Sequence, residues 1–465
     1  MKTYETKESV LEQSQILLHK SLRDIVPKAE IEKVESEVFG YKNRKKGFLG
    51  ELVEWYAFGK KPDGLSQPDF GVAGVELKTT PLKGHSKNKY VSKERLVFSM
   101  INYDEIVHET WEKSSFLKKN KILLLMFYLW VQGKSILDYE FKFIHLLNLL
   151  EDISDEDALQ IKKDWEFIVA KIKRGEAHLL SEGDTYYLGA CTKAANSRVV
   201  RDQPMSRTPA KPRAFSLKQQ YINYLVQTKL LGGKGNTESI FKKQKTIKTI
   251  EEVVKEKFTP YLGKTDKEIL SSLNDNLKNN SKSYKRLIVN RILGVVNSKN
   301  IEELEKANIT LKVVTLEPSG NLQESISFPA FDYKDLVTQV WYDDEEETMS
   351  DFHLQLETKK FLFVVFQKQK GLEEIVLKKV LFWNFPMKDL AEAESVWRKT
   401  VDCVNEGRYE DLPKISNSYV AHVRPHGKNS KDTTETPQNT QEVKRCFWLN
   451  AKYIQKAIES EKDQA

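Results

Sequence analysis

The sequence predicts an α/β (α+β) protein of two similar domains, each with a mixed central sheet flanked by helices. Three observations predict this class. Short apolar runs of strand length alternate with helical patterns, one order of landmarks occurs twice along the chain, and the composition is that of a globular protein. The chain has 465 residues, of which 40% are hydrophobic and 30% charged. That balance is enough to bury a core in each domain.

The repeated landmarks define two copies of one domain. Glu94–Tyr103 leads to Trp111, and Glu324–Tyr333 leads to Trp341 at the same spacing. Further matched pairs are the apolar runs that begin at Lys121 and Lys360, the segments Trp165–Gly175 and Trp397–Gly407, and the segments Arg213–Ile222 and Arg445–Ile454. A fixed order of several matches indicates an internal duplication. We predict a first domain at 1–225, a linker at 226–244 around Gly232–Asn236, and a second domain at 245–465.

Hydrophobic spacing gives the elements of the first copy in order. Helical spacing predicts a helix over Glu51–Phe58, and short bounded apolar runs predict strands at Val72–Leu77 and Leu96–Ile101. Ile122–Val131 is apolar on both faces, which is typical of a central strand covered on both sides. A long helix is expected over Asp157–Arg174. In the second copy the polar segment Lys428–Glu442 is expected to be a mobile loop, matching Ser197–Pro212 of the first.

Positive charge is concentrated in the first half of the chain. Residues 1–232 carry 37 basic and 31 acidic side chains, a net of +6, whereas the remaining 233 carry 37 and 36, a net of +1. The densest segment, Cys191–Lys218, has seven basic residues and one acidic residue. A single basic cluster is most simply a solvated surface. Several clusters interleaved with Gly, Asn, Pro and Ser favour a polyanion such as nucleic acid over a membrane surface.

Several classes of protein do not fit the composition. Three widely spaced cysteines are too few for a disulfide framework or a cysteine-based zinc site. The longest apolar run, Ile122–Val131, is roughly half of the ~20 residues that a membrane-spanning helix needs. The first residues contain no apolar stretch of a signal peptide. We therefore expect a cytoplasmic protein with no membrane partner and no small-molecule organic cofactor.

Asp69, Glu76 and Lys78 form a candidate catalytic motif. Glu76 and Lys78 differ by two residues on a strand, so both side chains point to one face. Two carboxylates on a loop and the next strand can share Mg²⁺, a hard ion that prefers oxygen ligands, and Glu54 on the preceding helix could add a third. The metal would activate a phosphodiester and a water molecule, while the lysine offsets developing negative charge. The competing interpretation is a buried ion pair at the edge of a sheet.

The second copy serves as an internal control for this motif. Aligning Ala73–Thr80 with Ala307–Val314 puts Thr310 at the position of Glu76. No acidic residue clearly replaces Glu54 in Arg286–Gly294. If the carboxylates only held the sheet together, both copies would be expected to keep them. We therefore predict that the second copy is non-catalytic.

The chain resembles a known family of nucleases. The segments that carry the resemblance are Lys46–Glu54, Asp69, Gly74–Thr79, Ser92–Val97, Ser114–Leu117, Lys193–Asn196, Gln203-Pro204, Arg213–Lys218 and His422–His426. The first copy resembles the MutH-type mismatch-repair nicking endonucleases. The whole chain resembles the two-domain Sau-type GATC-cutting type II restriction endonucleases.

The resemblance implies a restriction-endonuclease-like core with a PD-(D/E)xK site, Mg²⁺ dependence and recognition of duplex 5′-GATC. Glu54, Asp69 and Glu76 would then be the metal-binding carboxylates and Lys78 the catalytic lysine. A further family lysine falls at Lys118 or Lys119, and both remain candidates.

The same resemblance assigns the DNA-contacting residues. The region Lys193–Asn196 matches the loop of the family that reads a groove. This chain has Cys191-Thr192 where the nicking enzymes have Arg-Pro, whereas the second copy keeps Arg424-Pro425. The candidate DNA contacts are Lys46, Lys193, Asn196, Arg198, Arg201, Arg207, Lys211, Arg213, Lys218 and Arg424.

We expect double-stranded DNA as the partner, with one strand cut per catalytic domain. Cleavage of both strands would then need either two chains, such as a homodimer on DNA, or two sequential nicks. The second copy would bind another site or hold two chains together. Two alternatives are a strand-nicking repair enzyme and a non-catalytic GATC-binding regulator.

Overall fold

The structure is a computed structural model of the whole chain. It describes residues 4–40, 45–86, 89–193, 198–233, 237–242, 246–278, 283–295, 300–322, 324–343 and 348–460. These residues form two compact units. Unit 1 comprises Met1–His178, Thr185–Asn236 and Thr246–Thr249, and unit 2 comprises Leu179–Asp184, Thr237–Lys245 and Ile250–Ala465.

The segment predicted as a linker, 226–244, is largely part of the two units. Val226–Leu230 forms a π-helical turn, η7, with Val226 fully buried. Its Gln227 side chain donates to the Tyr90 carbonyl of unit 1 at 2.8 Å. Further along, Thr237–Glu238 forms strand β10 of unit 2, and Ile240 is buried. The predicted linker, 226–244, was therefore too long. Its Gly and polar residues do not reveal that Val226 and Ile240 are buried in the units on either side.

Unit 1 contains a four-stranded mixed sheet in the order β2-β1-β4-β5. The strands are β1 (Val75–Ser86), β2 (Lys89–Ser92), β4 (Ile122–Leu129) and β5 (Phe141–Asn148). β1 and β4 run parallel, and the two outer pairs are antiparallel. A second, antiparallel sheet has the order β3-β9-β6, built from β3 (Leu96–Met100), β9 (Arg213–Leu217) and β6 (Leu188–Thr192). The strands β7 (Arg201–Gln203) and β8 (Ser206–Ala210) form a hairpin.

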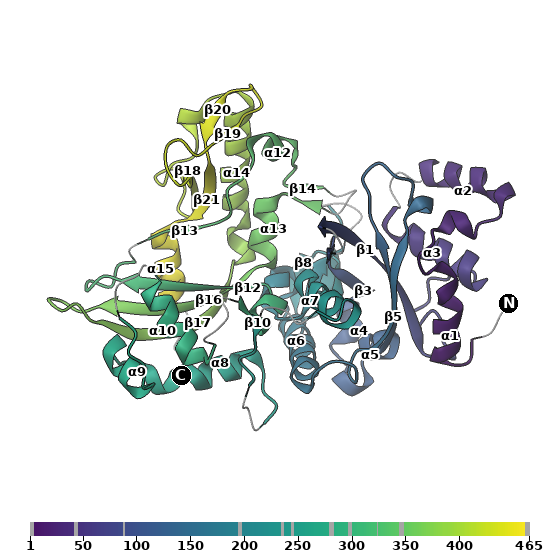
Figure 1. Cartoon of the computed structure of the whole chain (residues 1–465), viewed down its shortest axis with the longest axis horizontal. Coiled ribbons are helices and arrows are strands. Elements are labelled where there is room, and N and C mark those ends of the chain that lie inside the picture. The colour runs from purple at the N-terminus through teal and green to yellow at the C-terminus, as the bar shows by residue number, and fades with distance from the viewer. Residues whose placement is uncertain are drawn as a thin grey trace. The chain divides into compact units, whose positions relative to one another are not determined.

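Helices cover the sheets of unit 1. They are α1 (Lys7–Ser14), α2 (Lys28–Gly40), α3 (Lys45–Phe58), α4 (Tyr103–Ile106), α5 (Ser115–Asn120), α6 (Asp155–Lys173) and α7 (Gln219–Leu225). α1 and α3 lie beside β1 and β5 (Figure 1). Leu49 and Val53 of α3 share a buried cluster with Leu77 of β1 and Met126 of β4. β4 is buried along most of its length, so the predicted central strand is confirmed.

The long predicted helix is confirmed as α6, and its sequence explains its limits. The Ser154 hydroxyl caps the first turn by accepting from the Asp157 amide at 3.2 Å. Acidic residues fill the first turn and lysines the last, as the helix dipole favours. The helix ends at Lys173, and Gly175, two residues further on, has a φ of 73° in the left-handed region that commonly follows a helix. Trp165 and Ile168, three residues apart, lie on its buried face.

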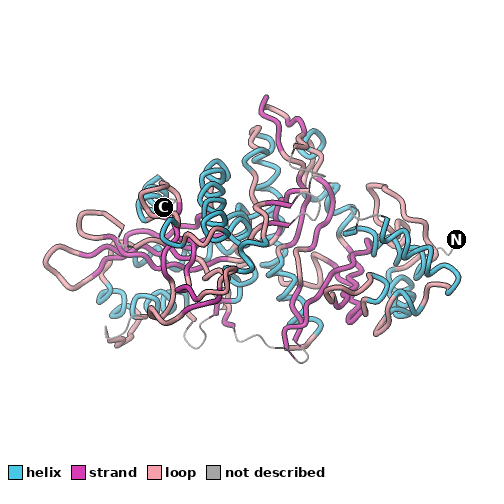
Figure 2. Tube along the Cα trace, turned by 90° about the horizontal axis from the view of Figure 1, so that it is seen from above, coloured by secondary structure: helices cyan, strands magenta, loops and turns pink. Residues whose placement is uncertain are grey.

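Unit 2 repeats this architecture. One sheet has the order β12-β16-β17, from β12 (Ile309–Leu316), β16 (Lys360–Lys368) and β17 (Ile375–Asn384), with β12 and β16 parallel. A second has the order β13-β21-β18, from β13 (Ile326–Ser327), β21 (Arg445–Leu449) and β18 (Ala421–Pro425). Three short pairs are β10 with β11 (Asn300–Ile301), β14 (Tyr342–Asp343) with β15 (Thr348–Met349), and β19 (Thr433–Glu435) with β20 (Gln441–Val443). The helices are α8 (Ile250–Phe258), α9 (Asp266–Ser272), α10 (Tyr284–Leu293), α11 (Glu302–Lys306), α12 (Tyr333–Thr338), α13 (Asp351–Thr358), α14 (Leu390–Asn405) and α15 (Ala451–Ser460). Figure 2 shows helices and strands intermixed along the chain.

Equivalent side-chain contacts occur in the two units. Trp111 packs on Trp165 with ring centroids 5.7 Å apart, and Trp341 packs on Trp397 at the same 5.7 Å. Such aromatic pairs contribute about 0.5–1.5 kcal/mol beyond the area they bury. The Tyr103 hydroxyl donates to the Lys211 carbonyl, as the Tyr333 hydroxyl does to the Val443 carbonyl. Matched contacts between matched landmarks are what a duplicated fold requires.

Two predictions of local structure needed correction. The strand predicted at Val72–Leu77 begins only at Val75 and continues to Ser86, because Gly71–Gly74 forms a turn in which Gly74 has a φ of 66°. The segment Lys428–Glu442, expected to be a mobile loop, contains strand β19 and most of β20, and Thr436 in the turn between them is fully buried. Polar side chains concealed this hairpin, since both of its strands have few apolar residues.

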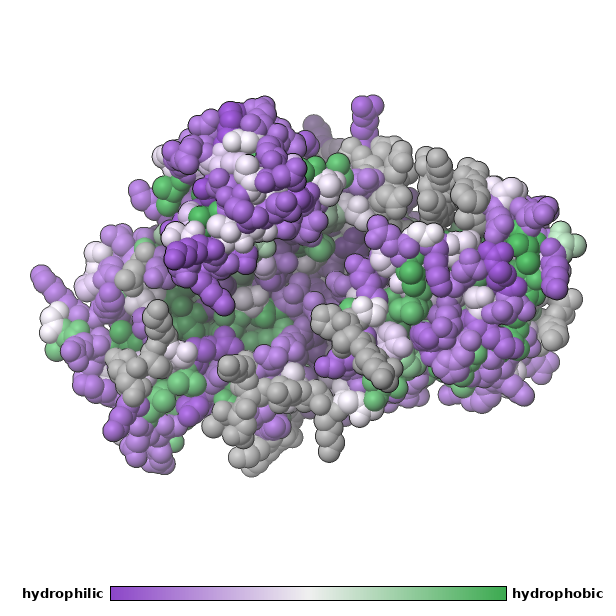
Figure 3. All heavy atoms as spheres, turned by 45° about the horizontal axis from the view of Figure 1, so that its top comes forward, coloured by the Kyte–Doolittle hydropathy of each residue, from purple (hydrophilic) through white to green (hydrophobic). Residues whose placement is uncertain are grey.

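The surface drawn in Figure 3 is mostly hydrophilic. None of the helices in the described ranges is long and apolar enough to cross a membrane. Cys191, Cys403 and Cys446 are buried, and none of them forms a disulfide within the described residues.

Candidate active site

A tight turn at the start of β1 brings Asp69 and Glu76 together. Phe70 and Val75 pair across this turn through two backbone hydrogen bonds of 2.9 and 3.2 Å. Gly74 makes the turn possible, since its positive φ strains any residue with a Cβ atom. Residues seven apart in sequence therefore become neighbours: the Asp69 amide donates to Glu76 Oε2 at 3.1 Å, and the Leu77 amide donates to Asp69 Oδ2 at 2.9 Å.

Glu76 and Lys78 lie on one face of β1, as their spacing predicts. Glu76 is 3% exposed. Lys78 Nζ lies 2.8 Å from Glu76 Oε1. On the opposite face, Leu77 packs into the apolar core with α3. The strand thus holds the carboxylate and the ammonium on the face opposite the apolar core that contains Leu77.

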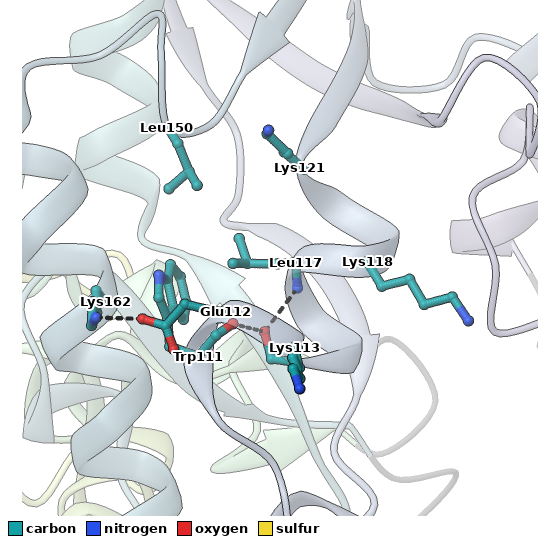
Figure 4. Close-up of a pocket in the computed structure, with 9 residues that line it drawn as sticks. Trp111, Glu112, Lys113, Leu117, Lys118, Lys121, Leu150 and Lys162 are labelled. Carbon is teal, nitrogen blue, oxygen red and sulfur yellow. Dashed lines mark hydrogen bonds and ion pairs between the residues drawn. The ribbon is translucent and has the colours of Figure 1, made fainter.

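The two candidate lysines of α5 lie in different surroundings. Lys119 Nζ lies 3.7 Å from Glu76 Oε1 and donates to the Leu65 carbonyl at 2.9 Å. Lys118 instead lines a pocket of about 620 Å³. Figure 4 shows the Lys118 side chain extending away from the Glu112–Lys162 pair in that pocket. Adjacent helical residues point about 100° apart, so only Lys119 reaches the Asp69–Glu76 site.

Glu54 on α3 supplies the third carboxylate of the region. α3 packs against β1, and a Cβ atom added at Gly50 would make only an ordinary van der Waals contact of 3.7 Å with the Thr79 hydroxyl. Glu54 is 9% exposed, and its Oε2 lies 2.7 Å from Lys60 Nζ. Sequence reasoning missed Lys60. A signal was present, because Gly59 ends α3 in the left-handed conformation and turns the next residue back toward the helix.

Burial and mutual repulsion act on both buried carboxylates. Burial raises the pKa of Glu76, and the charge of Asp69 raises it further, whereas Lys78 and Lys119 oppose that rise. Burial also raises the pKa of Glu54, with Lys60 opposing the rise and Asp69 adding to it. Both groups therefore lose their negative charge at a higher pH than an exposed glutamate does. Carboxylates with perturbed pKa values cluster at functional sites.

The donor set fits a hard divalent cation in chemistry and charge. Asp69, Glu76 and Glu54 offer carboxylate oxygens, the ligands that Mg²⁺ prefers. The charge of Asp69 acts on both Glu54 and Glu76. Within the part of the chain that the structure describes, no group of three or more His, Cys, Asp or Glu side chains is already arranged around a common point. Lys60 and Lys78 now contact Glu54 and Glu76, so both carboxylates are partly neutralised by the chain's own ammonium groups.

The predicted DNA-contacting residues differ in exposure. Arg198, Arg201, Arg207, Lys211 and Arg424 are exposed, and Lys193 is half-buried. Asn196 and the Lys46 side chain lie outside the described residues.

Lys218 and Arg213 are corrections to the predicted set. Lys218 is 1% exposed and donates to the Thr185 carbonyl at 2.6 Å. Arg213 is 2% exposed, and its Nη1 donates to the Ala190 carbonyl at 3.0 Å. Both side chains are directed into unit 1, so their placement does not support phosphate contact.

A mixed sheet that carries two carboxylates and a lysine at the start of a buried strand is the arrangement of a restriction-endonuclease-like nuclease. The comparisons agree with this class. The family model described as DNA mismatch repair enzyme MutH matches residues 58–164. The type II restriction enzyme Sau3AI of Staphylococcus aureus is 33% identical over 505 aligned residues, covering 99% of each chain. The chain therefore belongs to the Sau3AI-like, MutH-related family of type II restriction endonucleases, and it is a site-specific DNA endonuclease.

Mismatch-repair relatives match a smaller part of the chain. The DNA mismatch repair protein MutH of Vibrio vulnificus strain YJ016 is 28% identical over 188 residues, 40% of this chain and 78% of the relative. MutH of Escherichia coli O6:K15:H31 (strain 536 / UPEC) is 27% identical over 228 residues, 48% of this chain and 92% of the relative.

Proposed function

We propose that unit 1 hydrolyses one strand of duplex DNA at 5′-GATC with the help of Mg²⁺, and that the carboxylate–lysine site of β1 performs the reaction. The observation that carries the proposal is the cluster itself: the Asp69 amide donates to the Glu76 carboxylate, the Leu77 amide donates to the Asp69 carboxylate, and Lys78 Nζ lies 2.8 Å from Glu76 Oε1. When bound, Mg²⁺ supplies Lewis-acid activation of the phosphodiester and of the attacking water.

Each side chain of the site has a part in this proposal. Asp69, Glu76 and Glu54 hold the metal. Lys78 orients the attacking water and offsets the negative charge that develops on the phosphate. Lys119, whose Nζ lies 3.7 Å from Glu76 Oε1, adds a second positive charge and holds the loop at Leu65 through its carbonyl.

DNA binding is assigned to the exposed basic residues that surround the β7–β8 hairpin. Arg201 and Arg207 belong to its two strands, and Arg198 and Lys211 flank it. Such contacts give strongly salt-dependent affinity. The neighbouring segment Lys193–Asn196 is proposed to read base edges in the major groove.

Unit 2 is proposed to be a non-catalytic DNA-binding module that binds a second site or holds two chains together as a homodimer on DNA. At the position of Glu76 in β1, β12 carries Thr310, and a neutral hydroxyl is a poor ligand for a hard cation. We place the protein in the cytoplasm, where cysteines outside disulfides, such as Cys403, stay reduced.

The alternatives have less support. A strand-nicking repair enzyme is favoured only by relatives that match 40–48% of the chain, whereas the restriction enzyme covers 99% of it. A non-catalytic regulator leaves the buried Glu76 without a function, although burial makes its charge costly.

The test is cleavage of a plasmid that contains GATC sites, with Mg²⁺ and with chelator, by the wild-type chain and by Glu76→Ala. We expect cleavage only by the wild type and only with Mg²⁺. Glu151→Ala is the matched control, because Glu151 is an exposed carboxylate whose nearest cation, Lys121, lies 3.5 Å away on the surface. Equal cleavage by Glu76→Ala and by the control would remove the catalytic assignment.

A further inference from the structure

The tip of the β7–β8 hairpin carries an exposed methionine in a strained backbone conformation. Gln203 and Ser206 pair across the hairpin, so Pro204 and Met205 form its two-residue turn. Met205 has a φ of 62°, in the left-handed region that a residue with a Cβ atom rarely adopts. It is 85% exposed, the highest value among the large hydrophobic residues that the structure describes. Strained residues of this kind gather at functional sites, and packing does not explain this one.

The hairpin behind this tip is anchored on the end of α6. A Cβ atom added at Gly175 would lie 2.7 Å from the Met205 carbonyl oxygen, so the backbone of the tip packs directly on the glycine. Gln203 is buried, and it accepts from the Ala177 amide at 2.7 Å and donates to the Thr208 carbonyl at 2.5 Å. The backbone of the tip is therefore held in place, while the Met205 side chain stays in solvent.

Unit 2 shows that the fold does not require a methionine at such a tip. Its counterpart hairpin, β19–β20, packs its turn on Gly407, which matches Gly175 in the repeated landmarks. The left-handed position of that turn is occupied by Asn439, with a φ of 59°, and asparagine tolerates this conformation. The neighbouring Gln438 side chain is folded back and donates to the Val404 carbonyl at 3.0 Å. The strained apolar tip is thus a particular feature of unit 1.

Positive charge flanks the tip of unit 1. Arg207 follows Met205 by two residues on β8, and Arg201 precedes it by four residues on β7. Both arginines are exposed, and within the described ranges neither guanidinium forms an ion pair or a hydrogen bond. This charge favours a polyanion as the partner. A two-stranded β-ribbon fits the major groove of duplex DNA, which is about 12 Å wide, and not the minor groove, which is about 6 Å wide.

Depth in the groove separates the tip from the arginines. The tip of a ribbon reaches the floor of the groove, where the base edges lie, whereas side chains set back on its strands meet phosphates at the rim. The apolar group that bases present in the major groove is the thymine C5-methyl. Each strand of 5′-GATC contains one thymine. A methionine side chain is flexible and polarisable, so it can adapt its shape to a methyl group.

Met205 belongs to the same excursion of the chain as the segment proposed to read the major groove. The excursion leaves the sheet after Thr192 and returns at Arg213, and the Lys193 amide closes it by donating to the Pro212 carbonyl at 2.9 Å. It contains both the segment Lys193–Asn196 and the β7–β8 hairpin. One approach of this excursion to DNA would therefore bring both parts to the same groove.

We propose that Met205 reads the thymine of the recognition site by apolar contact with its C5-methyl group in the major groove, while Arg201 and Arg207 bind phosphates at the rim. The inference rests on the proposed cleavage of 5′-GATC by unit 1, and it adds a residue that determines specificity. The strained turn directs the methionine outward, where it has no partner until DNA is bound. One methyl contact corresponds to a preference of about three- to fivefold.

The experiment is a competition between two labelled duplexes that differ only at the thymine of the site. One contains 5′-GATC, and the other contains 5′-GAUC, in which deoxyuridine lacks the methyl group, on both strands. The full chain cleaves an equimolar mixture with Mg²⁺, and the ratio of the two rates gives the ratio of kcat/KM. We expect the wild type to prefer the thymine duplex by about three- to fivefold.

Three variants assign this preference to the methionine side chain. Met205→Gly should cleave the two duplexes at equal rates, and the thymine duplex more slowly than the wild type does. Met205→Leu, which stays apolar, should retain most of the preference. Asn439→Gly is the matched control, because it also exchanges an exposed left-handed residue for glycine at a hairpin turn, and it should keep the full preference. Met205→Gly should not lower the urea midpoint of unfolding, since glycine adopts a positive φ without strain.

A thymine preference that persists in Met205→Gly would overturn the inference, as would a wild type that cleaves both duplexes equally. If Met205→Gly slowed cleavage of both duplexes by the same factor and lowered the urea midpoint, Met205 would have a structural role and the inference would again fail. A wild type that cleaves neither duplex would instead remove the proposed cleavage of 5′-GATC, which is a distinguishable result.

Discussion

The assignment of Lys119, and not its neighbour Lys118, to the active site gives a sharp test. The two residues are adjacent on α5, carry the same charge and differ in what they contact. Lys119 Nζ lies 3.7 Å from Glu76 Oε1 and donates to the Leu65 carbonyl. Lys118 lines a separate pocket with Trp111 and Leu117 (Figure 4). The perturbation is Lys119→Gln, with Lys118→Gln as the matched control.

The structure sets the size of the expected effect. Two unit charges 3.7 Å apart interact by about 4 kcal/mol at an effective dielectric constant of about 20. Removal of one preorganised electrostatic donor from an active site typically costs about 2.7–4 kcal/mol, or about 10²–10³ in kcat. We expect Lys119→Gln to lose cleavage rate in that range. Lys118→Gln should stay within about 0.5 kcal/mol of the wild type, as exposed substitutions usually do.

The assay is single-turnover cleavage of a GATC plasmid with Mg²⁺ at saturating enzyme, so that binding and catalysis are separated. Glutamine is chosen because its amide can still donate to the Leu65 carbonyl, which isolates the loss of charge from the loss of the loop contact. Glu76 should also titrate at a higher pH in Lys119→Gln, since Lys119 opposes the rise of its pKa. A large rate loss in Lys118→Gln, or wild-type rates in Lys119→Gln, would refute the reasoning.

Two further predictions concern the half-buried Lys60 and the buried Lys218, whose partners sequence patterns do not reveal. Lys60 opposes the rise of the Glu54 pKa, so Lys60→Met should raise that pKa. Glu54 would then lose its charge at a higher pH, and the acidic limb of the pH–rate profile should move to higher pH, whereas it should not move in Lys61→Met. Burial raises the pKa of Asp164, and the buried Lys218 is one of the groups that oppose this rise. Lys218→Met should reduce the free energy of unfolding in urea by about 3–5 kcal/mol. If Lys218→Met left the urea midpoint unchanged and made DNA affinity less dependent on salt concentration, Lys218 would instead be a DNA-contacting residue.

The sequence by itself determined the repeated order of landmarks and the candidate catalytic motif. Strand β4 and helix α6 appear within about two residues of their predicted limits, because their apolar patterns are long and locally complete. The pair Glu76 and Lys78 shares a face because a strand repeats every two residues. The loss of the carboxylate at Thr310 is visible from the alignment of the two copies alone.

Only the tertiary structure decided which basic residues serve which purpose. Lys118 and Lys119 are equivalent in composition, and the choice between them depends on how α5 packs beside β1. Arg213 occurs in the most basic segment of the chain, yet a strand position directs its side chain to the Ala190 carbonyl inside unit 1. Charge is a local property of the sequence, whereas burial and partnership depend on contacts between residues that are far apart along the chain.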